Sequence, residues 1–385
     1  MSKSTLTVGL IGYQFMGKAH SNAYRQVNRY FDVPYQIRMK TICGQSQEGV
    51  SRACDTFGWE QYETDWRRVV DDPEIDIIDV STPGDSHKEI ACAAADAGKM
   101  VWCEKPIGNT LSEAQAIRDA VKKSGRPSVV FHTYRFAPAV ALAKKWIDEG
   151  RLGRVYHFRA VYLQDWITDP AFPLVWRLQK SKCGSGSLGD IGSHIIDLGR
   201  YLVGEITSVV GQMETFVTER PVLESTSGGL GSATSGSAMG QVDVDDATAF
   251  IARFRNGALG TFEASRFAMG RKNHNKIEIN AEHGSLVFNV ERMNELEYFE
   301  NAAPSEAQGF RTVQVTDGVH PFTGHYWPAG HIIGYEHTFI NLIVEALRAL
   351  EGNRDPSPNI EDGLQNQRVM DAVERSSNSK QWVNL

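Results

Sequence analysis

The sequence predicts two domains: an N-terminal α/β domain with a doubly wound parallel sheet, and a C-terminal α+β domain with an open, mostly antiparallel sheet. The chain has 385 residues, which is too many for one small core. Short apolar runs alternate with helical patterns up to about residue 130, as in β-α-β units. Beyond about residue 140, strand patterns instead follow one another through short turns. We therefore expect domains at 1–135 and 136–385.

The N-terminal half contains apolar runs of strand length, separated by segments with helical spacing. The expected strands are 7–11, 37–43, 75–80, 99–103 and 128–132, and the expected helices are 17–30, 87–97 and 111–124. Gly98 follows the helix at 87–97 in a C-cap position. Right-handed crossovers between such strands produce a doubly wound sheet.

The C-terminal half reads as a sheet of hairpins with one face covered by helices. Asn256-Gly257 between two apolar alternations is a strong hairpin signal. The expected strands are 153–163, 204–217, 247–254, 258–265, 276–281 and 285–290, and the expected helices are 193–202, 335–350 and 360–375. We expect the last helix to pack back toward the N-terminal domain. The glycine-, serine- and threonine-rich tract 224–240 is interpreted as a flexible surface loop.

Net charge, cysteine number and the length of apolar stretches argue against several classes of protein. The net charge of −7 and the absence of a run of five cations argue against a nucleic-acid binder. Five scattered cysteines suggest neither a disulfide framework nor a zinc site. No stretch approaches the roughly 20 apolar residues of a membrane span, and the N-terminus lacks a signal-peptide profile. We expect a cytoplasmic protein that needs no metal and binds no membrane.

A glycine loop after the first strand predicts a dinucleotide site. Such a loop lets backbone N–H groups approach a pyrophosphate at a helix N-terminus. The loop here is Gly12-Tyr13-Gln14-Phe15-Met16-Gly17, in which Gln14 replaces the second glycine of the usual fingerprint. The alternative is a tight turn that needs Gly12 and Gly17 for packing alone. The position of the loop in the first β-α unit favours a dinucleotide site over a packing turn.

Residues that follow the later strands are expected to contact the same dinucleotide, because ligands of open parallel sheets bind beyond the carboxyl ends of the strands. The expected cofactor contacts are Gly12, Gln14, Phe15, Met16, Gly44, Gln45, Ser81, Thr82, Pro83, His87, Glu104 and Lys105. Gly44-Gln45 offers neither an acid for a ribose nor a cation for a 2′-phosphate, so NAD is favoured and NADP stays open. His87 is equally consistent with an exposed first-turn residue.

The candidate catalytic residues are Lys105, Asp190 and His194. Lys105 follows a buried-looking strand and precedes Pro106, which restricts its backbone. Asp190 and His194 are four residues apart and so share one helix face. Each has a structural alternative: Lys105 paired with Glu104 in solvent, Asp190 as a helix cap, and His194 as a core histidine.

Taken together, these motifs resemble the Gfo/Idh/MocA oxidoreductases. The similarity lies in four segments in this order: 8–20 with Gly12, Gly17 and His20; 81–87; 97–106 with Glu104-Lys105-Pro106; and 189–197 with Asp190 and His194. It implies a Rossmann domain followed by a substrate-binding and oligomerisation domain. It also implies that Lys105, Asp190 and His194 occupy the family's catalytic positions.

A narrower likeness, to members of the levoglucosan dehydrogenase and glucoside 3-dehydrogenase type, is carried by 162–166, 176–180 and 327–331. Sugars present apolar faces and many hydroxyls, so a sugar-binding site is expected to combine tryptophan rings with amide and guanidinium donors. The expected substrate contacts are Tyr134, Gln164, Trp166, Trp176, Arg177, Asp190, His194 and His331. For Trp166 and Trp176 the alternative is a place in the core.

The favoured function is NAD(P)-dependent oxidation of a secondary hydroxyl on a sugar, glycoside, anhydrosugar or related polyol. His194 would be the general base and Lys105 would stabilise charge on the same oxygen. Two alternatives stay open: a glycosidase that works by transient oxidation and elimination, and a dinucleotide or sugar sensor without turnover. The broad second sheet predicts a homodimer or homotetramer.

Overall fold

The computed structural model describes residues 3–226 and 233–385, which form two compact units. Unit 1 contains 3–133 and Tyr335–Gln367, and unit 2 contains Tyr134–Thr226, Ala233–Gly334 and Arg368–Leu385. The break after Thr133 lies beside the expected boundary at 135. The segment Tyr335–Gln367 also groups with unit 1, which was expected for the start of the last helix but not for the helix predicted at 335–350.

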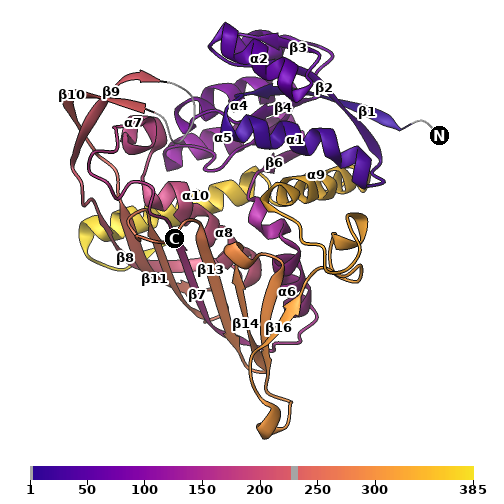
Figure 1. Ribbon diagram of the computed structural model, residues 1–385, viewed down its shortest axis with the longest axis vertical. Helices are drawn as coiled ribbons and strands as arrows, with labels where there is room; N and C mark the ends of the chain where they lie inside the picture. The colour runs from indigo at the N-terminus through magenta and orange to yellow at the C-terminus, as the bar shows by residue number, and fades with distance from the viewer. Residues whose placement is uncertain (1–2, 227–232) are drawn as a thin grey trace. The chain divides into compact units, whose positions relative to one another are not determined.

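Unit 1 is built on a six-stranded parallel sheet with the order β3-β2-β1-β4-β5-β6 (Figure 1). Its strands are β1 Ser4–Ile11, β2 Tyr35–Cys43, β3 Gln61–Glu63, β4 Ile77–Val80, β5 Met100–Cys103 and β6 Ser128–Val130. Its helices are α1 Phe15–Tyr30, α2 Gln47–Phe57, α3 Trp66–Asp71, α4 His87–Asp96, α5 Leu111–Ser124, α9 Tyr335–Glu351 and the start of α10 Ile360–Ser379. This confirms the doubly wound α/β domain.

Helices cover both faces of this sheet. α1 contacts α2 and α9, whereas α4 contacts α3 and α5. All residues of β4 and β5 are buried, as expected for a parallel strand covered on both faces. The elements α2, β3 and α3 were not predicted. β3 is short and lies at the sheet edge without an apolar run.

The grouping of α9 with unit 1 has a packing cause. Phe339, Ile343 and Leu347 of α9 are buried, and the Phe339 ring lies 6.3 Å from the ring of Phe131. α1 supplies the apolar surface that covers this face. Periodicity predicted the helix correctly but contained no information on which domain would bury it.

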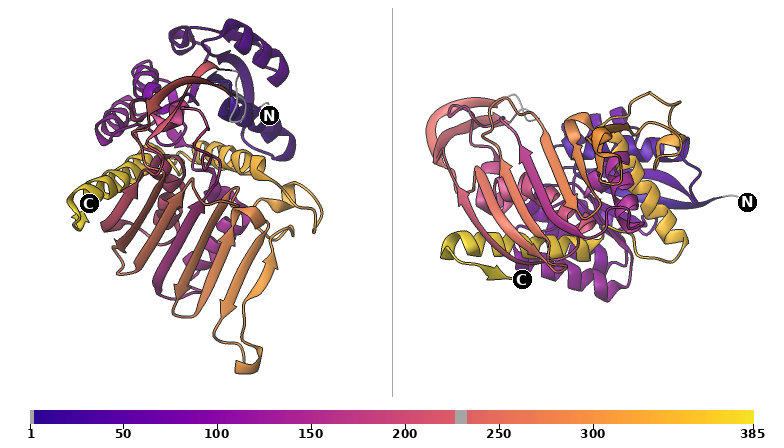
Figure 2. Two further views of the ribbon diagram at one scale, coloured as in Figure 1. Left: turned by 60° about the vertical axis from the view of Figure 1, so that its left-hand side comes forward. Right: turned by 90° about the horizontal axis from the view of Figure 1, so that it is seen from below.

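Unit 2 contains a nine-stranded sheet with the order β16-β15-β14-β13-β7-β12-β11-β8-β17, whose strands lie side by side in Figure 2. The strands are β7 Val155–Leu163, β8 Ile206–Glu214, β11 Ala247–Phe254, β12 Leu259–Ser265, β13 His274–Ala281, β14 Gly284–Asn289, β15 Glu295–Glu300, β16 Arg311–Gln314 and β17 Val383–Asn384. Within the described residues of this sheet, the β12–β7 pair is parallel and all other strand pairs are antiparallel. The expected open, mostly antiparallel sheet is confirmed.

Helices pack on one face of this sheet. α6 Pro138–Asp148 and α8 Ser193–Leu202 lie on this face, and the unit also contains α7 Lys180–Cys183 and the end of α10. α8 contacts β7 and β12, and α6 contacts β14 and β15. Along β11, Phe250 and Phe254 are buried whereas Ile251 and Arg253 are exposed, so the second face is open within this unit.

One expectation was wrong. The tract 224–240, interpreted as a surface loop, contributes to an antiparallel pair formed by β9 Glu219–Thr226 and β10 Ala233–Gln241. Strand pairing depends on backbone hydrogen bonds, so a strand rich in glycine and serine forms without apolar alternation. Residues 227–232 of this tract lie outside the described residues.

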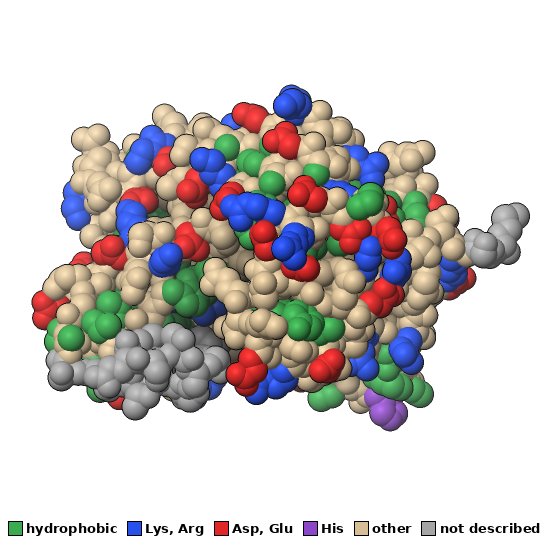
Figure 3. All heavy atoms as spheres, turned by 90° about the horizontal axis from the view of Figure 1, so that it is seen from above, with side chains coloured by type: hydrophobic (Ala, Val, Ile, Leu, Met, Phe, Trp, Pro, Cys, Tyr) green, Lys and Arg blue, Asp and Glu red, His purple; other side chains and the backbone are tan. Residues whose placement is uncertain are grey.

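Charges on the face shown in Figure 3 are mixed, with Lys and Arg interspersed among Asp and Glu. No described helix has the length and apolarity required to cross a membrane.

Candidate active site

The glycine loop lies between β1 and α1 as the sequence predicted. Gly12 has φ +113°, and an added Cβ would lie 2.7 Å from the carbonyl carbon and oxygen of Ser81. A Cβ at Gly17 would lie 2.2 Å from the Gly12 oxygen. Glycine is therefore required at both positions, and the backbone closes tightly around the start of α1.

The N-terminus of α1 suits an anion. Its N-cap residue, Gln14, makes no capping side-chain bond, and the first turn contains no acidic residue. The N–H groups of this turn lack side-chain partners from the cap and lie at the positive end of the helix dipole. The pyrophosphate of a dinucleotide fits this site, and Gln14 and Phe15 are exposed beside it.

The other expected cofactor residues follow β2, β4 and β5, at the same edge of the sheet. The Gly12 N–H donates to the Cys43 carbonyl, just before Gly44, and the Ser81 hydroxyl contacts the Gly12 carbonyl at 3.2 Å. The Tyr13 ring packs on Gly44 so closely that a Cβ there would lie 2.1 Å from it. The structure thus brings the ends of β1, β2 and β4 together in unit 1.

His87 is buried, so the alternative of an exposed first-turn residue does not hold. Its Nε2 lies 2.8 Å from the Thr82 carbonyl oxygen and its Nδ1 lies 2.9 Å from that of Pro106. Burial lowers the pKa of His87 despite these two acceptors. The ring therefore links the loops after β4 and β5, and its polar atoms face the protein.

Glu104 is also buried. Its carboxylate is 3.0 Å from His20 Nε2 and accepts a 3.0 Å bond from the backbone N–H of Lys105. Burial raises the pKa of Glu104, but His20 outweighs burial and holds it below the usual value. The Glu104 carboxylate is therefore buried in unit 1 and not solvated.

In unit 2, His194 lies against two tyrosines. The ring centroids of Tyr134 and His194 are 4.8 Å apart in an edge-on arrangement, and those of Tyr162 and His194 are 5.9 Å apart. The hydroxyls of Tyr134 and Tyr162 are 2.9 Å apart. Burial raises the pKa of Tyr134, which keeps its hydroxyl neutral.

An amide joins this pair to Gln164. Asn273 Oδ1 accepts from the Tyr162 hydroxyl at 2.7 Å and from Gln164 Nε2 at 3.0 Å. The Tyr162 proton is committed to Asn273, so the Tyr134 hydroxyl donates to the Tyr162 oxygen. Hydroxyl and amide groups beside an imidazole form the kind of array that recognises a polyhydroxylated ligand.

Asp190 lies near two guanidinium groups. It belongs to a single π-helical turn, Leu188–Gly192, that runs directly into α8. Its carboxylate oxygens are 3.9 Å from Arg177 Nε and 3.7 Å from Arg266 Nη1. The backbone N–H of Leu188 at the start of this turn donates to the Asp245 carboxylate at 2.8 Å, so Asp245, and not Asp190, caps the turn.

The two tryptophans flank these arginines. The Arg177 guanidinium lies 4.2 Å from the Trp176 ring centroid, and the Arg266 guanidinium lies 5.6 Å from that of Trp166. Both indoles are half-buried. Trp166 also packs on the small cluster around Ile167 and Leu178, so it combines core packing with a polar neighbour.

His331 stays apart from this array in the described contacts. It is exposed, and its Nδ1 lies 2.9 Å from the carbonyl oxygen of Pro328 in its own loop. Its role in substrate binding remains a prediction.

Two family models match the chain. Residues 6–132 match an oxidoreductase family with an NAD-binding Rossmann fold, and residues 140–287 match the GFO/IDH/MocA C-terminal domain. The chain is 44% identical over 383 residues to levoglucosan dehydrogenase of Pseudarthrobacter phenanthrenivorans, covering 99% of this chain and 98% of that enzyme. This chain belongs to the Gfo/Idh/MocA family.

Solved structures agree over the full length. Levoglucosan dehydrogenase in complex with NADH and levoglucosan superposes with a TM-score of 0.94 at 43% identity, covering 99% of both chains. An oxidoreductase domain protein from Kribbella flavida has a TM-score of 0.93 at 49% identity, again covering 99% of both chains. This Gfo/Idh/MocA protein is therefore an oxidoreductase whose Rossmann domain binds NAD.

Several residues that shape the site were not singled out from the sequence. They are Asp79, Arg135, Arg266 and Asn273, whereas His20, Tyr162 and Asp197 were noted only within the segments that carry the family resemblance. Arg266 follows a predicted apolar strand, and a charge at that place was a usable signal. The other partners are far apart in sequence, and only folding places them side by side.

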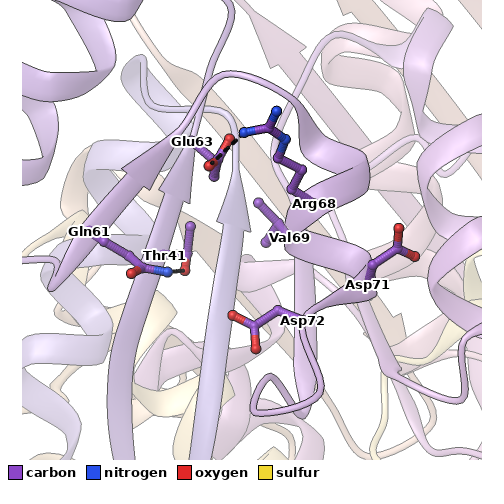
Figure 4. A pocket seen from close by; sticks show the side chains of 7 residues that line it. All are labelled: Thr41, Gln61, Glu63, Arg68, Val69, Asp71 and Asp72. Atoms are coloured by element: carbon purple, nitrogen blue, oxygen red, sulfur yellow. Dashed lines mark hydrogen bonds and ion pairs between the residues drawn. The ribbon is translucent and has the colours of Figure 1, made fainter.

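A hollow of about 420 Å³ in unit 1 lies between β2, β3 and α3 (Figure 4). Most of its polar side chains have partners: Gln61 donates to Thr41, Arg68 lies 3.6 Å from Glu63, and Lys40 bonds Asp72. No group of three or more His, Cys, Asp or Glu with metal-ligand geometry occurs among the described residues. We assign this hollow no ligand.

Proposed function

We propose that this protein is an NAD-dependent dehydrogenase that oxidises a secondary hydroxyl of a sugar, glycoside, anhydrosugar or related polyol. One observation carries the proposal. The polar and aromatic array around His194 occurs in a chain that is similar along its whole length to levoglucosan dehydrogenase, a protein solved with NADH and levoglucosan.

His194 is proposed as the general base. Imidazole titrates near neutral pH and can take the hydroxyl proton as the carbon is oxidised. Tyr134 and Tyr162 pack against its ring and limit how it can turn. Bound NAD⁺ supplies the hydride acceptor, whose chemistry belongs to the cofactor.

Lys105 is proposed to hydrogen-bond the same substrate oxygen. An ammonium there stabilises negative charge that develops on the oxygen. Asp190, held by Arg177 and Arg266, is proposed to accept a bond from a neighbouring hydroxyl and so orient the sugar. Gln164, Trp166, Trp176 and His331 are proposed to complete the substrate site.

NAD is proposed over NADP. A 2′-phosphate needs a cation near the end of β2, but the segment Gly44–Gly49 contains no lysine or arginine and places Glu48 in the first turn of α2. The carboxylate would repel a phosphate group.

The test is a substrate panel followed by nicotinamide absorbance. Anhydrosugars, glycosides, free sugars and inositols are each tested with NAD and with NADP. We expect NADH to accumulate with at least one sugar-like substrate. Release of aglycone without NADH would instead identify the transient-oxidation glycosidase, and NADH binding without turnover of any compound would identify a sensor.

Two substitutions test the roles. Lys105→Met and His194→Ala should each lower kcat by about 10³-fold or more, because each removes a group that acts on the reacting oxygen. The Kd for NADH, from fluorescence titration, should change by no more than about threefold. Near-normal turnover in either variant would remove that residue from the mechanism.

Self-association is proposed through the open face of the nine-stranded sheet. On β11 this face presents Ala249, Ile251 and Arg253, and Ile251 is 41% exposed. A broad, flat face with apolar side chains favours a symmetric contact with a second copy of the chain.

A further inference from the structure

We infer that His20, together with Asp79 and Glu104, is a positioning group that fixes Lys105 for its action on the substrate oxygen. The inference rests on the proposed function, because it takes Lys105 as the group that acts. None of these three residues need touch the substrate.

His20 is held between two carboxylates inside unit 1. Its side chain is fully buried, with Nδ1 2.8 Å from Asp79 Oδ2 and Nε2 3.0 Å from Glu104 Oε1. An ionised carboxylate only accepts hydrogen bonds, so both ring nitrogens must carry a proton. His20 is therefore an imidazolium, and the Tyr24 hydroxyl adds a 2.6 Å bond to Asp79.

Aromatic rings fix the plane of this imidazolium. The His20 ring centroid lies 3.9 Å from that of Phe131 and 5.4 Å from that of Phe339. A cation is favourable near an aromatic face, and the packing leaves the ring little room to rotate. The directions of both N–H bonds are consequently set.

The Glu104 carboxylate connects the fixed His20 ring to the backbone of Lys105. Glu104 Oε1 is held by His20, and Glu104 Oε2 accepts the backbone N–H of Lys105 at 3.0 Å. The side chain of Glu104 thus closes back on the peptide that follows it. This closure fixes the backbone from which the Lys105 ammonium extends, just after β5.

Net stability does not explain this arrangement well. Burying ion pairs contributes little compared with apolar side chains of the same volume, because desolvation offsets the attraction. A geometric role explains why the chain of ionisable groups from Asp79 through His20 to Glu104 ends on the backbone N–H of Lys105. His20 also belongs to α1, the helix that starts at the glycine loop, so the same element supports the phosphate site and the lysine.

The test is a double-mutant cycle with Lys105→Met. In the wild-type background, His20→Gln and Glu104→Gln should each lower kcat by about 10- to 100-fold, with Kd for NADH unchanged within about threefold. In the Lys105→Met background, the same substitutions should lower the residual kcat by less than about twofold, because the group they position is gone. Full additivity of the losses would overturn the inference.

A second variant covers the case in which His20→Gln does not fold. Glu104→Asp keeps the charge but withdraws the carboxylate by one methylene from the Lys105 N–H, so kcat should again fall while NADH affinity stays. Asp72→Asn is the matched control, because it removes one charge from the Lys40–Asp72 pair of the same unit and should leave kcat within about twofold. Unchanged kcat in Glu104→Asp would overturn the inference.

The two proposals fail in different ways. Near-normal turnover of Lys105→Met alone would refute the proposed role of the lysine. Loss of turnover in Lys105→Met, combined with additive or absent effects of the His20 and Glu104 substitutions, would refute only the positioning role.

Discussion

Burial and charge act against each other at His20. Burial disfavours the imidazolium and lowers its pKa, but Asp79 and Glu104 outweigh burial and raise the pKa to about 9. Since the unfolded value is about 6.5, the folded state binds the proton more tightly than the unfolded state. A single side chain therefore links the stability of unit 1 to pH.

The sign of this linkage gives a prediction. The stabilisation is fully present below pH 6.5 and is lost as pH rises through about 9. It amounts to roughly 3 kcal/mol, from about 1.4 kcal/mol per pKa unit. We expect the apparent free energy of unfolding, measured with urea, to fall between pH 7 and 10 in the wild type and to fall by less in His20→Gln. Parallel pH curves for the two proteins would contradict it.

Single buried pairs also decide how neighbouring elements are joined. An ion pair between Arg135 and Asp197 connects the helical turn Thr133–Phe136 to α8. Both side chains are buried. Arg135 Nε and Nη2 donate to the two carboxylate oxygens at 2.7 and 2.6 Å. The pair holds Tyr134, on the turn, near His194, on α8.

Loss of one partner of this pair should be costly. Asp197→Asn leaves the buried Arg135 charge uncompensated and should lower the free energy of unfolding by about 3 kcal/mol. The double variant Arg135→Met/Asp197→Leu removes both charges and should recover at least half of that loss. Urea denaturation of the three proteins checks this, and a double variant no more stable than Asp197→Asn would show that packing, and not charge, is the cause.

α10 satisfies backbone donors near one edge of the nine-stranded sheet in unit 2. β8 lies next to the short β17 at the edge of the nine-stranded sheet. The backbone N–H groups of Gly211 and Met213 donate to the hydroxyls of Ser376 and Ser377 on α10 at 3.1 and 2.9 Å. The helix therefore satisfies strand donors that would otherwise be open to another chain.

At the scale of the whole molecule, the two units divide the proposed chemistry. Unit 1 contains the expected cofactor residues and Lys105, and unit 2 contains His194 and the expected substrate side chains. The chain crosses between the units at 133/134, 334/335 and 367/368 in the described residues. This division agrees with separate family models for 6–132 and 140–287.

Self-association gives a prediction at this scale. Ile251→Asp places a charge on the open face of β11 and should lower the mass measured by light scattering toward that of the monomer, because a charge without a partner is costly to bury in an interface. The matched control is Ile332→Asp, at a loop residue that is 74% exposed, which should leave the mass unchanged. A monomer mass for the wild type would refute the proposed assembly.

Much of this organisation follows from local patterns. The helices α5 and α8 and the strand β11 were predicted with their exact bounds, because apolar periodicity and glycine punctuation act within a few residues. The strands in the tract 224–240 were not predicted, because their pairing depends on the backbone and produces no side-chain pattern in the sequence. The grouping of α9 with unit 1 was also missed, because a helical stripe does not specify its partner.

By itself, the sequence determined the fold class of both domains, many but not all of their strands and helices, the glycine loop and the identity of the candidate lysine, aspartate and histidine. Tertiary structure alone decided that His87 and Glu104 face inward, and that Asp79, Arg266 and Asn273 support the candidate site. The physical reason is distance along the chain. Periodicity and turn chemistry act between near neighbours, whereas burial and ion pairing join residues such as His20 and Glu104, which are 84 positions apart.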